Sequence, residues 1–69
     1  MRFVTVYRWL RWNDGHGRLE QDIHYATLEA IDRHAGVALH DSARLVLGGQ
    51  VDHAGFVHPS VLDLVDRAA

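Results

Sequence analysis

The feature that most constrains this fold is an N-terminal segment with large apolar side chains on both of its alternating faces. Along residues 2–12 one face carries Val4, Val6, Leu10 and Trp12, and the other carries Phe3, Tyr7, Trp9 and Arg11. A strand that is apolar on both faces has to be covered on both. Because the chain has only 69 residues to supply that cover, we expect part of this strand to form a surface for self-association or for a partner.

Length and composition limit what else the chain can be. A chain of 69 residues forms one domain, residues 1–69, and a domain of this size buries only about 60% of its unfolded surface. Such domains usually gain stability from a disulfide, a metal or a partner subunit, and disulfides are excluded because cysteine is absent. The sequence contains neither a signal peptide nor an apolar run of ~18 residues. We therefore expect a soluble, cytoplasmic protein with no membrane association.

Charge is distributed unevenly along the chain. All seven basic residues are arginine; residues 1–12 carry a charge of +3, and the remainder carries −5. Binding to duplex DNA requires a broad basic surface that neutralises phosphates. A domain that is acidic outside one strand is poorly suited to that role.

A turn signal divides the N-terminal third of the chain. Asp14-Gly15 between two strand-like runs indicates a β-hairpin. In the returning segment, residues 18–25, Leu19, Ile23 and Tyr25 share one face, which favours a half-buried strand. A helix that starts near Leu19 is an alternative, because apolar residues there also fit helical spacing.

The rest of the sequence predicts a helix, two strands and a second helix. Thr27 is expected to cap a helix over residues 28–35, with Gly36 as its C′ residue. Residues 37–39 and 43–51 are expected to be extended around a turn at residues 40–42, and a second turn at 52–55 leads to residues 56–58. Pro59 suits the first turn of a terminal helix. We therefore predict an α+β domain of order ββαββα, a small antiparallel sheet with two short helices on one face.

The length of the hairpin loop decides which face of the first strand is core. A four-residue loop pairs Trp12 with Leu19 and turns Val4, Val6 and Leu10 towards the helices, while Phe3, Tyr7 and Trp9 point away. A five-residue loop reverses the two faces. We favour the first register, and the side chains that we expect to be mostly buried are Val6, Leu10, Leu28, Ile31, Leu45, Leu47, Phe56, Leu62 and Val65.

Six histidines suggest a metal site or a pH switch. The best candidate cluster is Glu20, Asp22 and His24, which share a face of the expected strand. Side chains two residues apart are about 6.6 Å from one another along a strand, so we interpret this cluster as a solvated polar face. His40-Asp41-Ser42 contains the residue types of a hydrolytic triad, but adjacent side chains diverge, and a turn whose Asp or Ser satisfies backbone groups is the better interpretation.

These observations favour a small, non-enzymatic protein-interaction module, such as an inhibitor, adaptor or regulatory subunit, that needs no metal or other cofactor. Tyr, Trp and Arg are enriched in protein–protein hot spots. We therefore expect a protein partner, and a homodimer first, at the residues Phe3, Tyr7, Trp9, Arg11 and Trp12. The alternatives are a module that binds single-stranded nucleic acid by stacking bases on these aromatics, and a small histidine-dependent metal-binding domain.

Overall fold

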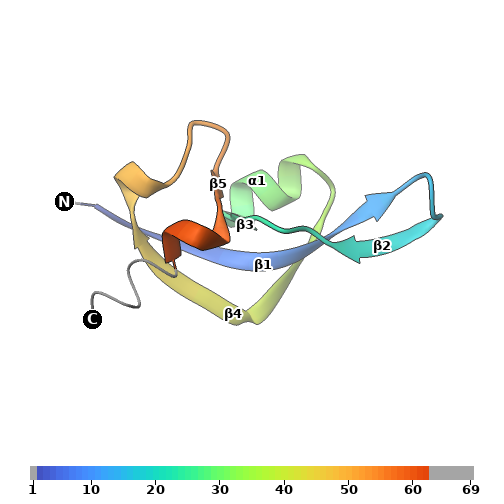
Figure 1. Ribbon diagram of the computed structural model, residues 1–69, viewed down its shortest axis with the longest axis horizontal. Helices are drawn as coiled ribbons and strands as arrows, with labels where there is room; N and C mark the ends of the chain where they lie inside the picture. Colours follow the sequence, from blue (N-terminus) through green and yellow to red (C-terminus); the bar gives the residue numbers. More distant parts are fainter. Residues whose placement is uncertain (1, 63–69) are drawn as a thin grey trace.

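The computed structural model describes residues 2–62 as an antiparallel sheet with short helices. The strands are β1 (Phe3–Asn13), β2 (Arg18–Gln21), β3 (Tyr25–Ala26), β4 (Val37–Leu47) and β5 (Phe56–Val57); α1 (Leu28–Arg33) follows β3, the 3-10 helix η1 (Gly48–Gln50) follows β4, and a further helix begins at residues 59–62. Figure 1 shows β1 running through the middle of the molecule. The expected α+β class is confirmed.

β1 organises the sheet because it pairs with three other strands. β2 and β3 follow one another along one edge of β1, β4 runs along the other edge, and all three are antiparallel to it. Trp12 lies opposite Leu19 across the hairpin, so the predicted hairpin and its four-residue loop are confirmed. The alternative helix from Leu19 is wrong, since residues 18–21 form a strand.

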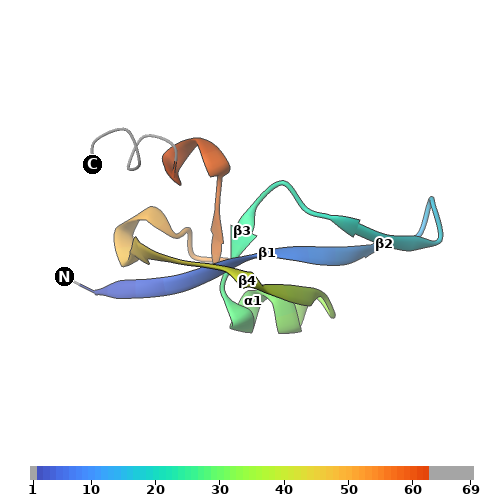
Figure 2. The same cartoon turned by 90° about the horizontal axis from the view of Figure 1, so that it is seen from below.

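The two helices lie on opposite faces of the sheet, and the prediction that they share one face is wrong. In Figure 2, α1 is on one side of the sheet and the helical turn at residues 59–62 is on the other. Each covers its own cluster of buried side chains. The Val6 cluster comprises Val6, Tyr25, Val46, Val57 and Leu62. The Trp9 cluster comprises Trp9, Ala26, Ala30 and Ile31.

Val6 and Trp9 are three positions apart along β1, which explains why the buried side chains form two clusters on opposite faces. Successive strand side chains point to opposite faces, so two large residues of β1 are buried on different sides. We expected Trp9 to point away from the helices, but its side chain is only 1% exposed, because α1 covers that face. The expected cover on both faces is thus supplied, over the middle of β1, by the chain itself.

The order of elements differs from ββαββα because a further strand, β3, precedes α1, and because the 3-10 helix η1 replaces the extended conformation expected at residues 48–50. The segment that returns from the hairpin breaks after Gln21 and resumes as the separate strand β3. The turn predicted at residues 40–42 is wrong, because β4 runs continuously past it with an irregularity: Val6 faces Arg44 and Arg8 faces Leu39. The Ser42 hydroxyl accepts a hydrogen bond from the Arg8 N–H at 2.7 Å and donates to the Leu39 carbonyl. Satisfaction of backbone groups by this serine is therefore confirmed.

The ends of α1 are determined by local chemistry. Thr27 caps the helix as predicted, and its hydroxyl accepts a hydrogen bond from the Ala30 N–H at 3.1 Å. At the other end Ala35 adopts a left-handed conformation, with φ of 54°. The N–H of Ala35 bonds to the Asp32 carbonyl and that of Gly36 to the Ile31 carbonyl, which is a Schellman motif. The left-handed C′ residue is thus Ala35, one position before the predicted Gly36.

The predicted core is partly right. Val6, Ile31 and Leu62 are buried, while Leu10, Leu47 and Phe56 are half-buried. Leu28 and Leu45 are exposed. Leu28 is exposed because α1 buries Ala30 and Ile31 instead. Leu45 is exposed because the short α1 does not reach the end of the sheet that carries it. Val65 lies outside the described residues. Within residues 2–62 no helix has the length and apolar character needed to cross a membrane.

Gly36 allows the helix exit to pack directly on Trp9. A Cβ at position 36 would lie 2.4 Å from Cε3 of the Trp9 ring, so Gly36→Ala has to displace a buried aromatic side chain. We expect it to lower the free energy of unfolding by about 1–3 kcal/mol, measured by urea denaturation. Gly49→Ala is the control, since nothing lies within 4 Å of a Cβ there. Equal midpoints for the two variants would contradict this packing.

Candidate functional site

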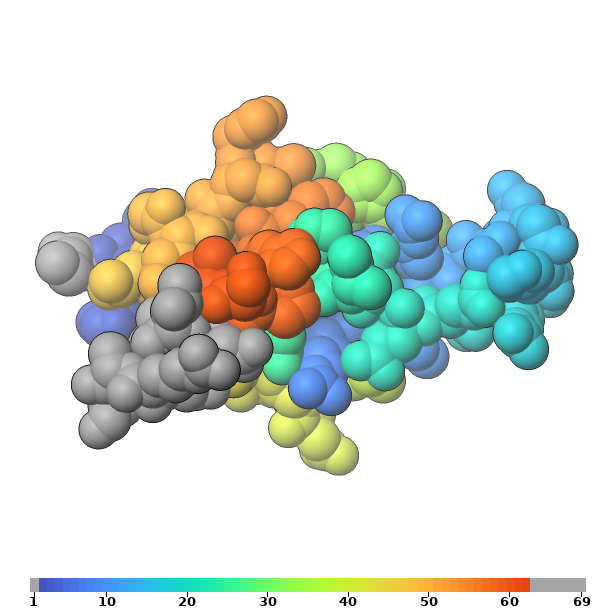
Figure 3. All heavy atoms as spheres, in the orientation of Figure 1, coloured from blue at the N-terminus to red at the C-terminus, as the bar shows by residue number. Residues whose placement is uncertain are grey.

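The hairpin projects from one end of the molecule, as the ribbon and the space-filling view both show (Figures 1 and 3). Pairing between β1 and β4 ends at Leu10, which lies opposite Val37, whereas pairing between β1 and β2 continues to Asn13. Residues 11–13 and 18–21 therefore form a two-stranded ribbon, here called the hairpin ribbon. An isolated two-stranded ribbon is marginally stable in water. The contacts on its two faces therefore help to decide whether it stays formed and what it can bind.

One face of this ribbon is apolar and open. Trp12 lies directly opposite Leu19, and Leu10 lies directly opposite Val37, so the four side chains share one face. Trp12 is 55% exposed, Val37 47% and Leu19 44%, and Leu10 is half-buried. We call Leu10, Trp12, Leu19 and Val37 the apolar hairpin face. It lies on the side of the sheet opposite α1, beyond the part that residues 59–62 cover.

The other face of the ribbon is polar, and its groups bind one another. Glu20 accepts hydrogen bonds from Asn13 and Arg18, and its carboxylate lies 3.0 Å from the His16 ring nitrogen Nδ1. The hydrogen bond with His16, followed by those from Asn13 and Arg18, lowers the pKa of Glu20 below its ordinary value of 4.5. Nearby, Arg11 Nε lies 3.4 Å from Asp22 Oδ2. The ribbon is therefore amphipathic.

Arg8 marks the inner boundary of the apolar hairpin face. It has the same parity along β1 as Leu10, and its Nε donates a hydrogen bond to the Tyr25 hydroxyl at 3.0 Å. The guanidinium also lies over the Tyr25 ring, 5.7 Å from its centroid. Beside it is an open hollow of about 530 Å³ that Gln21, Ile23 and Leu62 help to line. The apolar hairpin face thus ends at a cation that Tyr25 holds in place.

The structure separates the residues that the sequence grouped as an interaction site. Trp9 is buried, Tyr7 is half-buried against the Trp9 cluster, and Arg11 lies on the polar face. Phe3 is exposed, but it lies near the opposite end of β1 from Trp12. Only Trp12 belongs to the apolar hairpin face.

Sequence reasoning missed three members of this face, Leu10, Leu19 and Val37. For Leu19 the signal was present, because the favoured register already paired it with Trp12. The favoured register predicts that this face is core, but no element among residues 2–62 covers its outer end, where Trp12 and Leu19 are exposed. Val37 could not have been placed from local pattern, since its partner Leu10 is 27 positions away in sequence.

The structure does not bring the histidines into a compact metal site. Glu20 contacts His16, whereas Asp22 Oδ1 lies 3.2 Å from His24 Nδ1. Within residues 2–62 no group of three or more His, Asp or Glu side chains is placed to hold a metal ion. The His24 ring instead lies against the rings of Phe56 and His58, with centroids 6.0 Å and 5.6 Å away.

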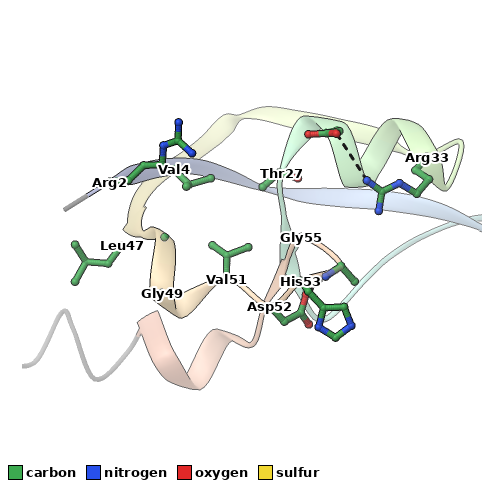
Figure 4. A pocket seen from close by; sticks show the side chains of 13 residues that line it. Arg2, Val4, Thr27, Arg33, Leu47, Gly49, Val51, Asp52, His53 and Gly55 are labelled. Carbon is green, nitrogen blue, oxygen red and sulfur yellow. Dashed lines mark hydrogen bonds and ion pairs between the residues drawn. The ribbon is translucent and has the colours of Figure 1, made fainter.

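A separate open cleft of about 600 Å³ lies between α1 and the loop that follows η1 (Figure 4). Its charged side chains stand around the rim, with Arg2, Arg33 and His53 at separate places along it. Asp52, also on the rim, accepts hydrogen bonds from the N–H groups of Phe56 and Ala54. These bonds, that from Phe56 first, lower its pKa below the ordinary 3.8. Asp52 thus stabilises the loop. The charged side chains of the rim do not point to one common position, as the polar groups of a small-molecule site usually do.

Comparison with known proteins gives no relative for this chain. No family model matches it, and neither a curated protein nor a solved structure matches it.

The lowered pKa of Glu20 predicts a specific acid sensitivity. A carboxylate whose pKa is depressed by folding stabilises the folded state above its ordinary value of 4.5, and that contribution is lost as pH falls through the lower folded-state value. Glu20→Gln should therefore unfold more easily at pH 7 and show a smaller further loss of stability below pH 4.5. Urea denaturation of both proteins from pH 7 to pH 3 measures this. Parallel pH profiles would show that Glu20 contributes nothing.

Proposed function

We propose that this chain is a small, non-enzymatic protein-interaction module that binds a protein partner through its apolar hairpin face. The observation that carries this proposal is the exposure of Trp12, Leu19 and Val37 side by side on a projecting ribbon. Contiguous exposed apolar surface is uncommon on monomers and usually marks an interface. The module would act as an inhibitor, adaptor or regulatory subunit.

The chemistry of the face favours a protein over a nucleic acid as partner. Stacking sites for single strands combine aromatic rings with cations that follow the phosphates. Here Trp12 is an exposed ring on a face whose neighbours are aliphatic, and Arg8 is engaged by Tyr25. Arg11 and Arg18 lie on the opposite face, each beside a carboxylate. An apolar centre with a tryptophan and a polar surround resembles a protein–protein hot spot.

Trp12→Ser tests the proposal directly. Because Trp12 is exposed, the variant should stay folded, but it should retain roughly a tenth or less of the partner captured from a lysate of the cells that encode the chain. Captured proteins are quantified by mass spectrometry.

Phe3→Ser is the matched control, because Phe3 is an exposed aromatic of the same strand outside the apolar hairpin face. It should capture the same partner as the parent chain. Equal losses in both variants, or none in Trp12→Ser, would show that the partner does not bind at this face.

A further inference from the structure

The outer edge of β2 carries unpaired backbone groups within the described part of the chain. β2 is the last strand on its side of the sheet and pairs only with β1. The Asp22 N–H donates to the Trp9 carbonyl at 3.0 Å. Because backbone groups in an antiparallel strand alternate in direction, those of Arg18 and Glu20 also point to β1. Those of Leu19 and Gln21 therefore point outward.

We propose that a second copy of this chain pairs with this edge, antiparallel and strand to strand, about a two-fold axis at Leu19. This inference extends the proposed function, since the dimer would supply the surface to which the partner binds. In this register the two Leu19 residues form a hydrogen-bonded pair through their outward N–H and C=O groups. An isologous contact of this kind closes after two copies.

Charge selects this register among those that the backbone allows. An axis at Leu19 places Arg18 opposite Glu20 of the second copy, twice over, and opposite charges at directly facing positions are stabilising. Backbone N–H and C=O groups that point away from β1 can pair only with the corresponding groups of the second copy. The neighbouring two-fold registers that meet this condition have their axis at Arg18 or at Glu20. Each then places two like charges opposite one another, which is unfavourable. The sequence Arg18-Leu19-Glu20 is therefore self-complementary in one alignment.

The outer edge of β4 is less suited to pairing. β4 carries an irregularity at which residues 40–43 lie between the positions paired with Arg8 and Val6. Such bulges bend an edge strand and protect it from pairing with another chain. The edge of β2 is short, but it has no bulge in its pairing with β1.

The pairing would double the surface that the partner meets. Two strands joined edge to edge about a two-fold axis present the same face on the same side of the sheet, so both copies of Trp12 and Leu19 would lie on one continuous surface. A single apolar hairpin face, three strands wide, measures roughly 15 Å by 15 Å. That is well below the ~800 Å² per partner that a stable interface buries.

Charge reversal with rescue tests the dimer. Sedimentation equilibrium of the full chain at micromolar concentration should give twice the 7.8 kDa mass. Arg18→Glu and Glu20→Arg should each raise the dissociation constant roughly tenfold or more, because each homodimer then has like charges at both contacts. An equimolar mixture of the two variants should associate as the parent chain does, since both contacts regain opposite charges.

Leu19→Pro gives an independent check, because it removes the outward N–H while no hydrogen bond to β1 depends on it. It should be monomeric with unchanged circular dichroism.

A monomeric parent chain, variants that dimerise as the parent does, or a mixture that fails to associate although both variants fold would each overturn the inference. Capture by the parent chain separates the two proposals. A parent chain that dimerises but captures no partner contradicts only the proposed function. A monomeric parent chain whose partner is lost in Trp12→Ser contradicts only the dimer.

Discussion

The structure depends on the need to cover both faces of β1. Val6 and Trp9 are both almost completely buried, and their parity along the strand sends them to opposite sides of the sheet. A helix on one face would leave one of them in water, at a cost of about 1.5–3 kcal/mol for a large apolar side chain. The chain therefore places α1 over Trp9 and the turn at residues 59–62 over Val6, and each core is small.

This division explains why the hairpin ribbon remains uncovered. Residues 2–62 cover both faces at the middle of β1, and no further element of this range lies over the outer end of the strand. The polar face of the ribbon needs no cover, because Glu20, Arg18, Asn13 and His16 satisfy one another there. The apolar face, around Trp12 and Leu19, has no such compensation. The exposed site is thus a consequence of how the core was built.

The parts of the fold that local chemistry determines could be predicted from the sequence, and those that depend on long-range pairing could not. The Asp14-Gly15 hairpin and the Thr27 cap are right because a few neighbouring residues determine each. The placement of both helices on one face was wrong, since nothing near α1 in the sequence tells which side of β1 it covers. The turn at residues 40–42 was also wrong, because a bulge uses the same polar residues as a turn. For the site, the sequence correctly predicts an exposed Trp12 but wrongly predicts an exposed Trp9, because α1, which buries Trp9, is far from it in the sequence.

The proposed association at the ribbon would be linked to the stability of the ribbon. A two-stranded ribbon is marginal alone, so its unbound form opens more readily than the three-stranded part of the sheet, where β4 supports β1. A partner on the apolar face, or a strand beside Leu19, stabilises only the closed form and therefore shifts the equilibrium towards it by mass action. The contacts of Glu20 with His16 and Asn13 near the loop act in the same direction without a partner. They keep the two strands aligned, so that the proposed association would not have to supply the whole cost of ordering the ribbon.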